Sequence, residues 1–192
     1  MKIGIGGIKF SEERFHLTHR AYSATDRSFA GLLREIANHR INLPFVCTRA
    51  GGEVHVSTFC IAAGDFPLLA GLLDDLPNSD PPPAQVGTLP FGYNFSGTSF
   101  RSQLEVIPRV GTLTLFPHRR DLALLGRVVE GVARSGIAIH SLCTSISALV
   151  LNIDYVLLDR AVKALEDIVV LPDNHAPFRP EFCVRQSNSL LP

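Results

Sequence analysis

An excess of charge of either sign is missing from this sequence. Lys and Arg together number 18, and so do Asp and Glu, which leaves a formal net charge of zero. A nucleic-acid-binding domain normally carries a positive excess that neutralises phosphates, so this class is excluded. No run of about 18 apolar residues is present, as a membrane-spanning helix would require, and the start of the chain lacks the apolar stretch of a signal peptide. We therefore expect a cytoplasmic protein with no nucleic-acid and no membrane partner.

Cysteine is scarce and is not spaced for metal or redox chemistry. The chain has four cysteines, none of them in a C-x-x-C pair: Cys47, Cys60, Cys143 and Cys183. Most of them lie in apolar, strand-like segments, so we interpret them as buried free thiols. No spacing of acid, base and nucleophile emerges either. We predict that the chain is not an enzyme, that it has no catalytic residues, and that it needs neither a cofactor nor a metal.

The sequence does contain one pattern twice, about half its length apart. In each copy five apolar residues fall at i, i+3, i+4, i+7 and i+8, the spacing of an amphipathic helix. They are Phe29, Leu32, Leu33, Ile36 and Ala37 in the first copy and Leu125, Val128, Val129, Val132 and Ala133 in the second. An apolar segment that ends in Cys-Thr follows each helix, at residues 41–48 and 137–144. We predict a duplicated module, too small per copy for most catalytic folds.

The order of the expected elements is the same in both copies. The first copy reads as strand 14–22, helix 28–39, strands 41–48 and 54–61, and a second helix that opens near residue 64. The second reads as strand 111–116, helix 122–135, strands 137–143 and 147–153, a helix near residues 158–165, and a last strand at 168–171. This βαββαβ order predicts an α+β fold of ferredoxin-like modules, with antiparallel sheets and helices on one face.

The expected division of the chain follows from these elements. We predict a first module at residues 1–84, a connector or arm at 85–108, a second module at 109–174 and a C-terminal arm at 175–192. The first copy has no obvious last strand, because a proline-rich stretch follows its second helix. Segments 85–89, 104–107 and 182–185 are the candidates, and the pattern does not choose among them.

The repeated order resembles the paired ACT regulatory domains of aspartate kinases. The second copy carries the resemblance best, with a helix that ends Ala-Arg-Ser-Gly at 133–136, the strand opening 137–139, the turn Cys-Thr-Ser at 143–145 and the helix 159–165. The first copy matches at 41–43. The resemblance implies modules that pair side by side and bind small effectors, mostly amino acids. No kinase-like region precedes the repeat, so we expect a free-standing sensor or a regulatory subunit.

Two parts of each module are candidates for contacting an effector. The turn before the first helix offers backbone N–H groups at a positive helix end, which suit a carboxylate. Its residues are Thr25, Asp26, Arg27 and Ser28 in the first copy and His118, Arg119, Arg120 and Asp121 in the second. The aspartates suit an ammonium and the arginines a carboxylate, although helix capping and solvation explain the same residues.

The second part is the opening of the second strand, which family-type sites also use. Its residues are Ile41, Asn42 and Leu43 in the first copy and Ile137, Ala138 and Ile139 in the second. We therefore predict a sensor that binds an amino acid or similar effector at an ACT–ACT seam, as a homodimer or higher homo-oligomer. The alternative is a ligand-free assembly module that serves as the regulatory subunit of a partner enzyme.

Overall fold

The chain forms two compact units, one of which lies within the sequence of the other. The computed structural model describes residues 2–21, 28–51, 54–75, 104–116, 122–145 and 147–172. The flanking unit consists of Met1–Arg14 together with Arg109–Pro192, and the inserted unit is Phe15–Pro108. Among the described residues, no helix is long and apolar enough to cross a membrane.

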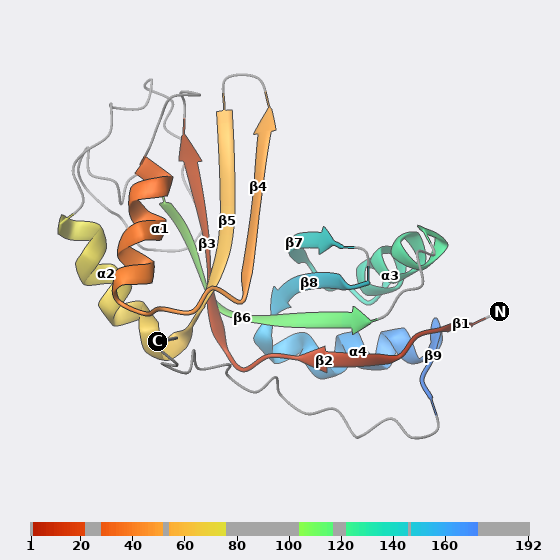
Figure 1. Cartoon of the computed structure of the whole chain (residues 1–192). Coiled ribbons are helices and arrows are strands. Elements are labelled where there is room, and N and C mark those ends of the chain that lie inside the picture. The colour runs from red at the N-terminus through yellow and green to blue at the C-terminus, as the bar shows by residue number, and fades with distance from the viewer. Residues whose placement is uncertain are drawn as a thin grey trace, which may run out of the picture. The chain divides into compact units, whose positions relative to one another are not determined.

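The inserted unit has the predicted βαββαβ order (Figure 1). Its elements are β3 (Arg14–Ala21), α1 (Ser28–Asn38), β4 (Phe45–Gly51), β5 (Val54–Ala62), α2 (Phe66–Asp75) and the first part of β6 (Leu104–Phe116). The strands lie in the order β4-β5-β3-β6, with β4 antiparallel to β5. Of the three candidates for the missing last strand, 104–107 is the one that pairs with β3. The other two lie outside the described residues.

Both helices of the inserted unit cover one face of its sheet. Leu32 and Ile36 lie on the face of α1 that the sequence spacing predicted to be apolar. Both are buried against Leu17, Phe59 and other apolar side chains. Complete burial of one Leu or Ile contributes about 1.5–3 kcal/mol. The opposite face of β3 is buried as well, at His16 and Thr18. The middle of β3 is therefore buried on both of its faces.

The flanking unit repeats the order from the second part of β6 onward. It continues with α3 (Leu122–Arg134), β7 (Ile139–Thr144), β8 (Leu149–Asp154), α4 (Leu158–Glu166) and β9 (Val169–Val170). Pairing of β6 with β8 and of β8 with β7 is antiparallel. The apolar residues of α3 and α4, including Val128, Val132, Ala161 and Leu165, pack in one core with the sheet residues Leu113 and Leu151.

The N-terminal residues belong to the flanking unit. β2 (Gly7–Phe10) pairs antiparallel with β6, and in Figure 1 this red strand runs along the green one. β1 (Ile3–Gly4) pairs in parallel with β9. Residues 1–14 were predicted to lie in the first module, whereas Ile5 and Ile8, which are 2% and 3% exposed, belong to the core of the flanking unit. The predicted boundary of the first module therefore does not hold at its N-terminal end.

The structure describes only a small part of the predicted connector and none of the predicted C-terminal arm. The connector 85–108 lies outside the described residues except for 104–108, which begin β6. The C-terminal arm 175–192 lies wholly outside them. Cys60 is buried, as predicted, but Cys47 and Cys143 are only half-buried, and Cys183 lies outside the described residues. Within the described ranges, no group of three or more His, Cys, Asp or Glu side chains is placed to hold a metal.

Candidate functional site

The strand opening of the inserted unit is shaped by the end of helix α1. Arg40 has a positive φ of 56°, and its N–H donates to the carbonyl of Ala37 at 3.0 Å. The N–H of Ile41 donates to the carbonyl of Ile36 at 3.0 Å. These two bonds make a Schellman motif, which ends a helix by satisfying its last carbonyls and turns the chain sharply. The chain therefore leaves α1 directly into residues 41–43.

The same motif ends α3 in the flanking unit. Gly136 has a φ of 68°, and its N–H donates to the carbonyl of Ala133 at 2.9 Å. The N–H of Ile137 donates to the carbonyl of Val132 at 3.3 Å. Both units therefore present their strand openings in the same way, although one uses Gly and the other Arg at the left-handed position. This also explains why β4 and β7 begin later than the sequence predicted.

Burial separates the six predicted residues at these openings. Ile41 and Ile137 are 6% and 4% exposed and belong to the two cores. Leu43 and Ile139 are partly buried and pack on the same cores. Asn42 and Ala138 are exposed. The first unit thus offers a polar side chain at its strand opening, and the second offers only backbone groups there.

The predicted turns before the first helices fall mostly outside the described residues. This applies to Thr25, Asp26 and Arg27 in the first copy and to His118, Arg119, Arg120 and Asp121 in the second. Ser28 is the first residue of α1. The proposed contacts of these residues with an effector therefore stay predictions.

A polar network that the sequence did not indicate crosses the sheet of the flanking unit. The Thr112 hydroxyl donates to Asn152 Oδ1 at 2.7 Å and accepts from Arg14 Nη1 at 2.9 Å. Asn152 Nδ2 donates to Ser141 Oγ at 2.8 Å, and the Thr112 N–H donates to Ser11 Oγ at 2.9 Å. Thr112 and Asn152 are buried. Because their polar groups are hydrogen-bonded to one another, the network ties β6, β7 and β8 together rather than offering groups to a ligand.

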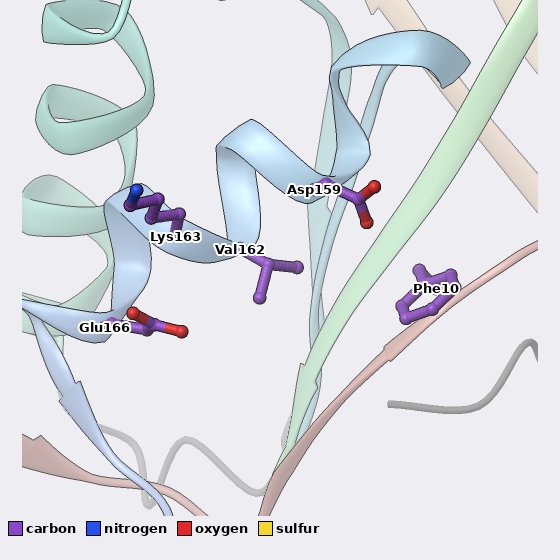
Figure 2. Close-up of a pocket in the computed structure, with 5 residues that line it drawn as sticks. All are labelled: Phe10, Asp159, Val162, Lys163 and Glu166. Atoms are coloured by element: carbon purple, nitrogen blue, oxygen red, sulfur yellow. The ribbon is translucent and has the colours of Figure 1, made fainter. Parts of the chain in front are cut away.

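A cavity of about 460 Å³ lies at the side of the flanking unit. It is lined by Phe10 at the end of β2 and by four residues of α4: Asp159, Val162, Lys163 and Glu166. Figure 2 shows the side chains of Asp159, Val162 and Glu166 pointing from α4 toward Phe10. The Lys163 amino group points away from that ring in the same view. The apolar spacing in the sequence predicted only the buried face of this helix and did not indicate that Phe10 of β2 lies beside its charged face.

The two units define a tandem α+β protein with ferredoxin-like modules. No protein-family model and no curated protein matches the sequence. Among solved structures, the ligand-free regulatory subunit of aspartate kinase from Thermus thermophilus is similar, with a TM-score of 0.64 and 10% identity over 85% of this chain and 97% of that chain. The predicted resemblance to the paired ACT regulatory domains of aspartate kinases is therefore confirmed for the fold.

Complete aspartate kinases match over a smaller share of their own length. The enzyme from Clostridium acetobutylicum has a TM-score of 0.61 at 10% identity, over 87% of this chain and 36% of that chain. Aspartokinase III from E. coli, in complex with lysine and aspartate, has a TM-score of 0.54 at 15% identity, over 86% of this chain and 33% of that chain. The likeness thus spans about a third of these enzymes and nearly all of the regulatory subunit.

Proposed function

We propose that this protein is a regulatory sensor that binds an amino acid or a similar small effector at a seam between ACT-type modules. The observation that carries the proposal is the duplicated strand opening, where the same Schellman motif leads into exposed Asn42 in one unit and exposed Ala138 in the other. A fold shared with a kinase regulatory subunit over nearly its full length supports a regulatory role. Homo-oligomerisation and a partner enzyme are part of the same proposal.

The chemistry of a free amino acid sets the requirements of such a site. Its carboxylate and its ammonium both need partners, because burying an unpaired charge is costly. Backbone N–H groups before α1 or α3 suit the carboxylate, and Asp26 or Asp121 suits the ammonium. Asn42 adds an amide to the site of the inserted unit. We therefore propose that the inserted unit is the better binder of the two.

The test is thermal unfolding of the full chain against each common amino acid at millimolar concentration. An effector at 100 times its dissociation constant raises the free energy of unfolding by about 2.7 kcal/mol. We expect one amino acid to raise the melting temperature selectively, and Asn42→Ala to reduce that shift more than Ala138→Ser does. A flat panel would contradict effector binding and would favour the ligand-free assembly module, for which a stable complex with a partner enzyme is the expected finding.

A further inference from the structure

We propose a second ligand site, in the cavity between β2 and α4 of the flanking unit, that accepts a small aliphatic diamine. It uses none of the residues of the proposed effector site. The cavity has a volume of about 460 Å³, which is within the range of small-molecule sites. Its lining combines two carboxylates, an aliphatic side chain, an aromatic ring and the side chain of Lys163, whose amino group points away from the ring in Figure 2.

Three of the four lining residues of α4 form a pattern of anion, apolar group and anion. Asp159, Val162 and Glu166 stand at i, i+3 and i+7, which places all three side chains on one narrow face of a helix. At a rise of about 1.5 Å per residue, the two acidic residues lie about 10 Å apart along the axis. An aliphatic diamine has the complementary pattern, with one ammonium at each end of an apolar chain.

The apolar part of the cavity suits the chain of such a ligand. Val162 is only 7% exposed and belongs to the core, so its surface forms a floor that does not depend on a mobile side chain. Phe10 is half-buried and packs against the same core from β2. Methylene groups of a diamine would be removed from water between these two side chains. An ammonium beside the Phe10 ring would gain a cation–π contact as well.

The two carboxylates are available to a ligand. Asp159 and Glu166 make no ion pair with any residue in the described part of the chain, even though Lys163 lies at i+4 from one and i−3 from the other. This spacing commonly supports ion pairs. On α3, Glu130 and Arg134 do pair at i, i+4. The carboxylate of Glu130 is thus paired, whereas those of Asp159 and Glu166 are open to a cationic ligand.

The repeat supplies an internal comparison. The buried residues of α4 correspond to those of α2, since Leu158, Ala161 and Leu165 stand where Phe66, Leu69 and Leu73 do. Two of the four cavity positions differ in chemistry, because Asp159 and Lys163 are replaced by Pro67 and Gly71 in α2. Val162 and Glu166 correspond to Ala70 and Asp74, so α2 lacks the first of the two anions. The anion–apolar–anion pattern thus belongs to one copy only, whereas the residues that hold the fold are shared.

Calorimetric titration of the full chain at low ionic strength tests the proposal, because salt screens exposed charges. The two probes are cadaverine and pentylamine, which have the same chain length and differ by one amino group. We expect cadaverine to bind about threefold to fivefold more tightly, the contribution of one additional exposed ion pair. Asp159→Asn and Glu166→Gln should each reduce cadaverine to the affinity of pentylamine.

Three controls make the result specific. Glu130→Gln removes the same charge from α3 and should leave cadaverine binding unchanged. Lys163→Gln should not weaken it, because the substitution removes a cation that repels the ligand. Melting without ligand should change little for all four variants, which alter exposed residues. Equal affinity for the two probes, no cadaverine binding, or equal loss in Glu130→Gln would each overturn the diamine site.

Titration with L-lysine separates this site from the proposed effector site. Lysine carries the two amino groups of cadaverine and a carboxylate in addition. Lysine binding that survives both Asp159→Asn and Glu166→Gln, together with no cadaverine binding, would overturn the diamine site and leave the effector proposal intact. Cadaverine binding with a flat amino-acid panel would support the diamine site and count against the effector proposal.

Discussion

A Cβ atom on Gly111 would lie 2.5 Å from Cδ1 of Leu158. Any larger residue at position 111 would therefore force the Leu158 side chain, or the strand and helix themselves, to move. In the inserted unit the corresponding places on β3 and α2 are held by Phe15 and Phe66, whose rings stack at 3.9 Å. One copy fills the junction between strand and helix with two aromatic rings, and the other with a glycine and a leucine.

Substitution of Gly111 tests this close approach. We expect Gly111→Ala to lower the free energy of unfolding by about 1–3 kcal/mol, the usual cost of overpacking a core. Gly126 in α3 is a matched control, because an added Cβ meets nothing within 4 Å. Gly126→Ala should raise stability by up to about 1 kcal/mol through helix propensity. Denaturant unfolding measures both, and equal effects of the two substitutions would contradict the packing argument.

The two helix ends predict stability changes of opposite sign. Arg40 and Gly136 hold the same left-handed position, with φ of 56° and 68°. A residue with a Cβ is strained there by about 1–2 kcal/mol. Gly136→Ala should therefore destabilise the protein by about 1 kcal/mol, and Arg40→Gly should stabilise it by about 0.5–1 kcal/mol. If thermal unfolding showed Arg40→Gly to be destabilising, the Arg40 side chain would have a role beyond the backbone motif.

Removal of the buried amide should show what the polar network contributes. Asn152→Ala removes one hydrogen-bond partner from the Thr112 hydroxyl and one from the Ser141 hydroxyl, which costs about 1–3 kcal/mol. A double-mutant cycle with Ser141→Ala measures the coupling between the two side chains. A coupling energy near zero would mean that the hydrogen bond between Asn152 and Ser141 does not stabilise the sheet.

The placement of the N-terminal segment predicts which part of the molecule responds to its loss. Ile8→Ala removes a buried side chain from the core of the flanking unit, at a cost of about 2–5 kcal/mol. Hydrogen exchange should then speed up in β6, β7, β8 and α4 while α1, β4 and β5 keep more of their protection. Faster exchange in the inserted unit alone would contradict the assignment of residues 1–14.

Local pattern alone predicted the helices and most of the strands of this protein. Spacing placed Leu32 and Ile36 on the buried face of α1, and Val128 and Val132 on that of α3, and all four are buried. Gly136 belonged to the helix end on which the resemblance to the family rested, and glycine is the usual residue at such an end. Arg40 carries no such signal, so the matching end of α1 was visible only in the structure.

The candidate sites depended more heavily on the tertiary structure. The sequence predicted Ile41 and Ile137 as effector contacts, but their side chains lie in the cores and leave Asn42 and Ala138 exposed. The cavity beside α4 was not foreseen, because it needs Phe10 from a segment about 150 residues away in the chain.

What the sequence by itself determined is the duplicated order of elements and the apolar face of each helix. These follow from the period of the backbone, which acts within one segment. Only the tertiary structure decided that β2 pairs with β6, that β6 serves both units, and that residues 1–14 complete the flanking unit. The hydrophobicity of a segment predicts that the strand is buried. Which strand it pairs with depends on register and on packing between segments that are remote in sequence.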